Sequence, residues 1–314
     1  AVSNSFMIAG QCVAPVLLLI VLGIVLRKVH WLNEDGVAAL DRLSFRLLLP
    51  LALFKNIYNS DFKTAFDGRL VLISVVLVVL SFGLAVAVSA WKEKEPPRRA
   101  ALAQSIFRNN CLVFGLPMMT AMYGTEEVGM FSLILAFVIP LNNVLAVVLI
   151  SLLTSRKITV IELLKRLITN PYVIFVIASL LIKLTGIILP QAVTKAISDL
   201  AAASTPMAVI SMGAGLYLAS LRQDAGTVLF GSFVRLVLGP VIFLPLLALI
   251  GVRGAALTAL YFVIGTPCAV ASYIMAKQMG ADGDLAGHLV VVQSLLSIIT
   301  IFFFLSVMGL LGWT

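Results

Sequence analysis

Charged residues are scarce in this sequence. Asp, Glu, Lys and Arg make up 11% of the 314 residues, whereas a soluble globular chain carries roughly 25%. Hydrophobic residues account for 61% of the chain, and its mean hydropathy is +1.12. Because no soluble core needs this much apolar surface, the composition excludes an ordinary soluble protein. The lack of charge instead predicts an all-α protein that crosses a membrane several times.

Residues for covalent catalysis and metal binding are equally scarce. The two histidines are His30 and His288, and the three cysteines, Cys12, Cys111 and Cys268, lie singly in apolar runs without a Cys-x-x-Cys pair. The sequence also lacks a glycine-rich phosphate loop. We therefore expect no enzyme, no metal site, no disulfide framework and no cofactor.

Basic residues give the chain a net charge of +8, but they lie between the apolar runs and form no single face. This distribution is an orientation signal, and we expect no nucleic-acid partner. Counting Lys and Arg at the loops places about twice as many on one side, which predicts an integral membrane protein with both termini exterior. No basic segment precedes the first apolar run, so no cleavable signal peptide is expected.

The apolar runs have the length of about twenty residues that a helix needs to span a bilayer. We predict ten transmembrane helices, over residues 6–26, 37–58, 70–91, 100–123, 128–153, 171–188, 192–220, 226–250, 255–279 and 284–311.

The connection between the fifth and sixth predicted helices divides the chain in two. Residues 154–170 have apolar side chains at helical spacing among charged ones, which predicts an amphipathic cytoplasmic connector. Residues 1–153 would form a first five-helix repeat and residues 171–314 a second. The segment ending in Gly124-Thr-Glu126 also resembles the one ending in Gly280-Ala-Asp282. Since five is odd, the second repeat would insert with inverted topology, as in secondary transporters.

The fourth and ninth predicted helices are interrupted at matching positions. Residues 105–117 contain Arg, two Asn, Gly and Pro inside a hydrophobic run, and Gly-Thr-Pro-Cys follows at 265–268. Irregular backbone is tolerated at membrane depth only where it is buried in protein or lines a cavity. Two such breaks are typical of crossover helices that form a binding site. The alternative is a pair of proline kinks whose polar groups are satisfied internally.

A broken helix has chemistry suited to ion binding. Its unpaired N–H groups attract anions at one end, and its unpaired C=O groups attract cations at the other. The amides of the fourth and fifth helices could bind a carboxylate, although those of the fifth could instead bond between helices. The predicted substrate-binding residues are Asn109, Asn110, Cys111, Gly115, Pro117, Asn142, Asn143, Gly265, Thr266, Pro267 and Cys268.

Two ionisable residues, Arg108 and His288, are candidates for a proton or anion role. A charge at membrane depth marks a transport pathway, but Arg108 could equally extend to the cytoplasmic surface. For Arg46 and Arg235 the same two alternatives, a role in the pathway or extension to the surface, stay open. The acidic residues near the breaks lie at helix ends, so a sodium site is not obvious, and H+ coupling, Na+ coupling and uniport all stay open.

The first break also has a recognisable signature. Asn110-Cys-Leu-Val-Phe-Gly-Leu-Pro117 resembles the Asn-x-x-x-x-Gly-x-Pro motif of the auxin efflux carrier family. That family contains plant auxin carriers and bacterial permeases for malate, malonate and similar acids. Pro267, followed by Ala276-Lys277 and an acidic residue, is similar to the family's second crossover. The short connector resembles the compact bacterial type, although Leu112 stands where many bacterial members have Gly.

The resemblance implies a secondary transporter of small organic anions, such as mono- or dicarboxylates, in a bacterial inner membrane. Helices one, two, six and seven would form a scaffold that also makes a homodimer. Helices three to five and eight to ten would form a mobile transport domain that works as an elevator. Asn110 and the backbone at Pro117 and Pro267 would hold the carboxylate. The alternative is a membrane sensor with the same fold that binds the ligand without moving it.

Overall fold

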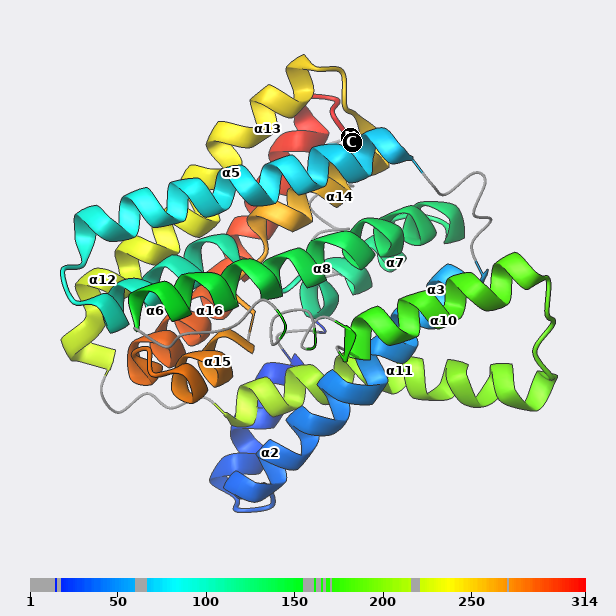
Figure 1. Ribbon diagram of the computed structural model, residues 1–314, viewed down its shortest axis with the longest axis horizontal. Coiled ribbons are helices and arrows are strands. Elements are labelled where there is room, and N and C mark those ends of the chain that lie inside the picture. Colours follow the sequence, from blue (N-terminus) through cyan, green and yellow to red (C-terminus); the bar gives the residue numbers. More distant parts are fainter. Residues whose placement is uncertain are drawn as a thin grey trace.

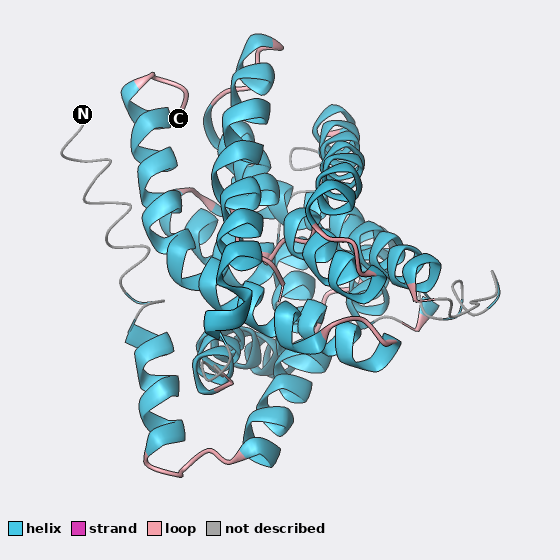
Figure 2. Ribbon diagram, turned by 90° about the vertical axis from the view of Figure 1, so that its left-hand side faces the viewer, coloured by secondary structure: helices cyan, strands magenta, loops and turns pink. Residues whose placement is uncertain are grey.

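The computed structural model describes residues 15, 18–59, 67–154, 161, 165, 168–169, 171–215, 221–269 and 271–314. These residues form helices joined by short loops, and none of them is in a strand (Figure 2). Most of the predicted first helix, Cys12 and most of the predicted connector lie outside the described residues.

Four helices are long and apolar enough to cross a membrane, and two further apolar helices are shorter. The four are α5 (Gly68–Lys92), α8 (Thr125–Leu153), the continuous helix Arg222–Leu249 and α16 (Gly283–Leu310). The all-helical, polytopic membrane class predicted from the composition is therefore confirmed. The continuous helix consists of α12 (Leu221–Phe233), η3 (Val234–Leu238) and α13 (Gly239–Leu249). The other elements are α2 (Glu34–Leu43), η1 (Ser44–Leu48), α3 (Leu49–Asn59), α6 (Pro96–Phe107), η2 (Cys111–Gly115), α7 (Leu116–Met122), α10 (Pro171–Thr185), α11 (Gln191–Ala214), α14 (Gly254–Gly265) and α15 (Ala271–Met279).

The helices pack in two groups (Figure 1). In the first group, α3 packs against α10 and α11, and α2 and η1 pack against α11. The helix over residues 18–28 joins this group by close backbone approach, because a Cβ at Gly213 would lie 2.3 Å from the Ile20 carbonyl oxygen. In the second group, α5, α6, α8 and α12 to α16 pack together, and α8 also contacts α3 and α10.

Three π-helical segments are each followed by a proline. The residue two positions after η1 is Pro50, after η2 it is Pro117, and after η3 it is Pro240. Proline lacks the N–H that would bond to the carbonyl four residues earlier, and its ring clashes with that carbonyl. A wide π turn accommodates both effects and is frequently found at functional sites. The sequence shows the prolines but does not predict the π turns.

The fourth and ninth predicted helices are each interrupted, and the fragments match in length. Both α6 and α14 contain 12 residues and end where the chain becomes irregular, at residues 108–110 and 266–269. We call these segments the first break and the second break. The full-length helices that follow, α8 and α16, contain 29 and 28 residues.

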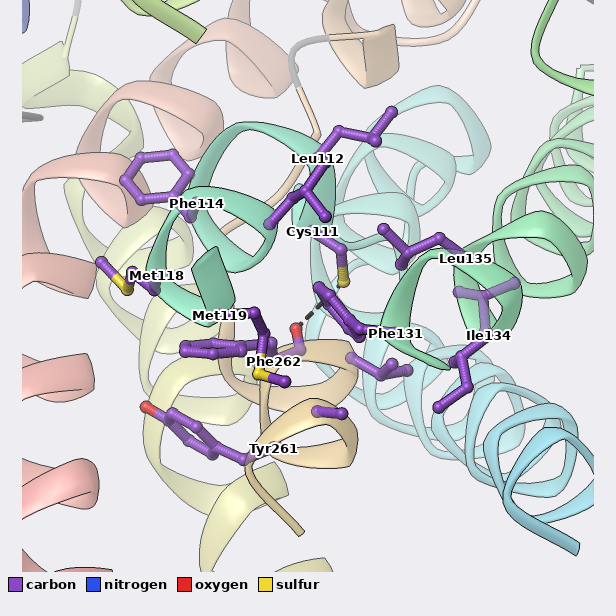
Figure 3. Packing of buried hydrophobic residues seen from close by; sticks show 14 of the residues in the cluster. Cys111, Leu112, Phe114, Met118, Met119, Phe131, Ile134, Leu135, Tyr261 and Phe262 are labelled. Atoms are coloured by element: carbon purple, nitrogen blue, oxygen red, sulfur yellow. Dashed lines mark hydrogen bonds between the residues drawn. The ribbon is translucent and has the colours of Figure 1, made fainter. Parts of the chain in front are cut away.

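The core lies around the first break (Figure 3). The π segment η2 packs against α14 and α11, and its Phe114 is 1% exposed. The rings of Phe131 from α8 and Phe262 from α14 lie 6.1 Å apart at a tilted angle. This packing leaves so little room that a Cβ at Gly115 would lie 3.0 Å from both of those residues. Gly115 therefore permits the close packing of η2 here, and a side chain at this position would require Phe131 or Phe262 to shift.

Candidate functional site

The first break places three polar residues in the protein interior. Arg108, Asn109 and Asn110 follow the end of α6 in extended or irregular conformations, and their exposed fractions are 3%, 8% and 4%. The Asn110 carbonyl accepts a hydrogen bond from the Phe114 N–H at 3.1 Å, which begins η2. Chain irregularity of this kind needs other partners for its backbone groups.

The second break supplies some of those partners. The Asn110 N–H donates to the Pro267 carbonyl at 2.9 Å. The Cys111 thiol donates to the Phe262 carbonyl at 3.1 Å (Figure 3) and lies 3.7 Å from the Thr266 hydroxyl oxygen. The two breaks are thus in direct contact, although 155 residues, from 111 to 265, separate them in the sequence.

Side chains within the second break and α16 satisfy its own polar groups. The Thr266 hydroxyl donates to the Phe262 carbonyl at 2.7 Å, and the Cys268 N–H donates to Gln293 Oε1 at 2.9 Å. The Cys268 thiol lies 3.2 Å from the Ser272 hydroxyl oxygen. This break is packed and hydrogen-bonded without help from a ligand.

Arg235 joins the ends of both interrupted helices. Its guanidinium donates to the carbonyls of Ile106 and Phe107 at the end of α6, at 3.1 and 3.4 Å. It also donates to the carbonyls of Val263 and Thr266 at the end of α14, at 3.1 and 2.8 Å. One buried side chain therefore satisfies helix-terminal carbonyls from two helices.

A cavity of about 1100 Å³ borders the first break. On one side it is lined by Arg108, Asn109 and Asn110, and by side chains of α8, α15 and α16. On the other side it is lined by α2 and α11, including Asp41 and Ser211. The cavity therefore lies between the two groups of helices and extends to exposed residues such as Glu34 and Arg42.

Several amide groups around the cavity are buried without a protein partner. Within the described part of the chain, no hydrogen-bond partner is present for Nδ2 of Asn109, Nδ2 of Asn110, or either polar atom of the Asn142 side chain. A buried polar group without a partner costs about 1–3 kcal/mol of stability. Because all three residues line the cavity, a polar ligand or water there would satisfy them.

The Arg108 guanidinium points toward α8 and α15. It donates to Asn143 Oδ1 at 2.7 Å and to Gln104 Oε1 at 3.2 Å, and it lies 2.9 Å from the Met275 sulfur. Arg108 also lines the cavity and is 3% exposed. The side chain is thus buried among protein groups in this structure, and its role in transport stays a prediction.

His288, which lines the same cavity, belongs to a charged cluster. Its Nδ1 lies 2.8 Å from Asp224 Oδ2, and Asp224 also accepts a 2.9 Å ion pair from Arg98. Arg98 further contacts Glu93 at 3.4 Å and Asp282 at 3.2 Å. Burial lowers the pKa of Arg98, but the hydrogen bond to Asp224 and the charge of Glu93 raise it, and the net pKa lies above its ordinary value.

The predicted site residues thus divide into two sets. Those that line the cavity are Arg108, Asn109, Asn110, Cys111, Asn142, Asn143 and His288. The others lie outside the described lining of the cavity, in or near the breaks. They are Gly115, Pro117, Gly265, Thr266, Pro267 and Cys268.

Sequence reasoning left the role of Arg235 open and did not predict the contacts that three residues make. Arg235 and Gln293 hold the breaks in place, and Gln104 supports Arg108. Arg235 and Gln293 have partners at least 25 positions away in the sequence, so the hydrophobic pattern of their own helices gives no sign of these contacts. Gln104 bonds to Arg108 only four residues further along the chain. In the described part of the chain, no three His, Cys, Asp or Glu residues gather in a way that could hold a metal ion.

Comparison with known proteins agrees with this architecture. A family model described as membrane transport protein matches residues 9–305. The chain is also similar to a protein of Methanothermobacter thermautotrophicus named uncharacterized transporter, at 23% identity over 303 residues that cover 94% of this chain and 97% of the relative. Because the family model covers nearly the whole sequence, the chain belongs to this family of membrane transport proteins, the auxin efflux carrier family, and is a transporter and not an enzyme.

Proposed function

We propose that this protein is a secondary transporter of small organic anions, such as mono- or dicarboxylates, and that it binds them at the first break. The observation that carries the proposal is the set of buried donors beside the cavity, formed by Arg108 and the unpartnered amides of Asn109, Asn110 and Asn142. A carboxylate supplies acceptors for such donors, and a hydrogen bond from a charged donor is about twice as strong as one between neutral groups.

Two helix N-termini add partial positive charge to that of Arg108 beside the cavity. The helix of η2 and α7 begins at Cys111 and α15 begins at Ala271, and both residues line the cavity. Each helix N-terminus is equivalent to about half a positive charge. Together with Arg108 they supply about two positive charges, which suits one or two carboxylates. On the facing wall, Asp41 already accepts a 2.6 Å hydrogen bond from Ser211.

The arrangement of helices supports an elevator-type mechanism. We propose that α2, η1, α3, α10 and α11 form the scaffold and that α5 to α8 and α12 to α16 form the transport domain, with the cavity between them. The matched fragments α6 and α14, and α8 and α16, support ten spans in two inverted repeats with crossover helices at the breaks. Exposed apolar residues of α10, including Ile174 and Leu181, suit a homodimer contact or lipid.

The orientation and driving force are also proposals. With the loop after residue 28 in the cytoplasm and both termini exterior, the cavity opens to the cytoplasm, in a bacterial inner membrane. His288, bonded to Asp224 on the cavity wall, is the group through which we propose that a coupling proton acts. To test this coupling, uptake by the wild type and by His288→Gln is measured with and without an imposed proton gradient. The gradient should stimulate uptake by the wild type only, and equal stimulation of the two proteins would contradict the proposal.

Uptake into proteoliposomes tests the proposed function. A panel of radiolabelled mono- and dicarboxylates is offered to the wild type, to Asn110→Ala and to Asn59→Ala, in which an exposed Asn at the end of α3 is removed as a matched control. We expect saturable uptake by the wild type and the control, and a loss of roughly a hundredfold in Asn110→Ala while its melting temperature is kept. Undiminished uptake by Asn110→Ala would contradict the site. Saturable binding without flux would instead favour a membrane sensor.

A further inference from the structure

Arg235 is a buried cation without a carboxylate partner. It is 3% exposed and lies in η3, and among the described residues no acidic side chain forms an ion pair with it. Its four hydrogen bonds all go to backbone carbonyls. An unpaired buried charge is very costly, so the energetic compensation for this guanidinium must come from those carbonyls.

The charges of the helix ends balance that of Arg235. The carbonyls of Ile106 and Phe107 end α6, and those of Val263 and Thr266 lie at the end of α14. Each helix C-terminus is equivalent to about half a negative charge. Two such ends amount to about one negative charge, which matches the single positive charge of the guanidinium.

In secondary transporters with broken helices, the C-terminal ends of half-helices are places where a coupling cation binds. Here the guanidinium already lies at both ends. We propose that Arg235 is a resident cation that takes the place of a bound Na+ at these helix ends and positions the two breaks for anion binding. This inference rests on the proposed transport function, since it concerns how that site is held and what drives it.

The chemistry of arginine fits this role. Its planar guanidinium presents five N–H donors in a fixed fork, and here it reaches carbonyls of two separate helices at once. The ammonium of lysine is a compact charge with three donors, so it could not bridge the same four carbonyls. The breaks in contact with these helix ends carry Asn110 and Pro267, whose mutual hydrogen bond of 2.9 Å depends on their spacing.

Replacement of Na+ tests the first part of the proposal. Uptake of a transported carboxylate by wild-type proteoliposomes is measured with Na+ on both sides and with choline in its place. We expect initial rates that agree within about twofold, because no Na+ needs to bind at the helix ends. An absolute requirement for Na+ would overturn the proposal. Absence of carboxylate flux and binding under both conditions would instead overturn the proposed function.

Chemical rescue tests the second part. In Arg235→Ala we expect uptake to fall roughly a hundredfold, the order expected when one partner of a buried charge interaction is removed. Guanidinium ion at millimolar concentration should restore at least a tenth of the wild-type rate by occupying the vacated space, whereas neutral urea should not. Arg253→Ala is the matched control, because Arg253 also donates to a helix-terminal carbonyl, that of Ala248 at the end of α13, but lies outside the breaks.

Each outcome of the rescue has a defined meaning. Restoration of uptake by guanidinium only in Arg235→Ala supports the proposal, and so does a variant that becomes monodisperse only when guanidinium is present during purification. Wild-type uptake by untreated Arg235→Ala would overturn it. A variant that guanidinium restores neither in folding nor in uptake would overturn it as well. Arg235→Lys, which keeps the charge, should fold and retain more uptake than Arg235→Ala.

Discussion

The two breaks have matching positions but different chemistry. Aligned by the last residues of α6 and α14, the first break offers Arg108, Asn109 and Asn110, and the second offers Thr266, Pro267 and Cys268. The first set lines the cavity and includes amide groups without protein partners, whereas the second is hydrogen-bonded to its own neighbours and to Gln293.

In the proposed mechanism, this difference corresponds to separate roles for the two breaks. A ligand site needs polar groups that are held in place but not yet satisfied, which describes the first break. The side chains of the second break itself, Thr266 and Cys268, are instead paired with protein groups, and the Cys268 N–H is paired with Gln293 Oε1. Gly115 and Pro117 follow the first break, whereas Gly265 and Pro267 lie at the start of the second. In the proposed mechanism, the polar side chains therefore decide which break contacts a substrate.

The largest effect should come from the charge at the first break. We expect Arg108→Ala to weaken carboxylate affinity by roughly a hundredfold, because a charge-assisted hydrogen bond contributes about 2–5 kcal/mol when its partner is buried. The half-saturation concentration for uptake measures this, with Arg69→Ala as a control that removes an exposed arginine. Equal affinity in Arg108→Ala and the wild type would remove Arg108 from the site.

A methyl group at the second break should reduce stability more than one near the first. A Cβ at Gly265 would lie 2.3 Å from the ring of the fully buried Tyr261, whereas one at Gly115 would meet Phe131 at 3.0 Å. Overpacking of this kind costs about 1–3 kcal/mol. Thermal unfolding in detergent should therefore show a larger loss for Gly265→Ala than for Gly115→Ala. The reverse order would mean that Tyr261 moves aside freely.

Removing the side-chain support of the second break should affect stability but not affinity. In Gln293→Leu the buried Cys268 N–H loses its acceptor at 2.9 Å, which costs about 1–3 kcal/mol. We expect a lower melting temperature and a half-saturation concentration for uptake within about threefold of the wild type. A large loss of affinity at unchanged stability would place Gln293 in the site itself.

The smallest effect should come from Cys268→Ala. Cys268 occupies the position that corresponds to Asn110, but its thiol lies against Ser272 and is fully buried. We expect uptake within about threefold of the wild type and a loss of stability of about 1 kcal/mol for the weak hydrogen bond. Loss of uptake equal to that of Asn110→Ala would show that both breaks contact the substrate, and the two segments would no longer differ in role.

The backbone plan could be predicted from the sequence because its causes are local. Apolar runs of spanning length indicate where helices form, and Pro267 lies two residues after the end of α14. Pro117 does not mark the end of α6, which stops ten residues earlier at Phe107, because Pro117 lies in the first turn of α7. The predicted interruptions of the fourth and ninth helices agree with the ends of α6 and α14. The sequence does not predict the π turns, because its pattern around a proline that follows a π turn does not differ from the pattern around a proline inside an ordinary helix, such as Pro206.

The partners of buried polar residues could not be predicted in the same way. Arg235 and Arg108 are both arginines in hydrophobic segments, yet one binds carbonyls of two helices and the other borders a cavity. Their surroundings come from residues that are up to 167 positions away. The pairing of His288 with Asp224, 64 positions apart, is of the same kind. Only the packing of the helices decides such contacts.

Ligand-induced stabilisation is the most direct test of an anion site at the first break. The melting temperatures of the purified wild type, Asn110→Ala and Asn59→Ala are compared across a panel of carboxylates, since a ligand at a hundred times its Kd stabilises the native state by about 2.7 kcal/mol. We predict that the same carboxylate raises the melting temperature of the wild type and Asn59→Ala but leaves that of Asn110→Ala unchanged. Equal stabilisation of all three proteins would contradict the account.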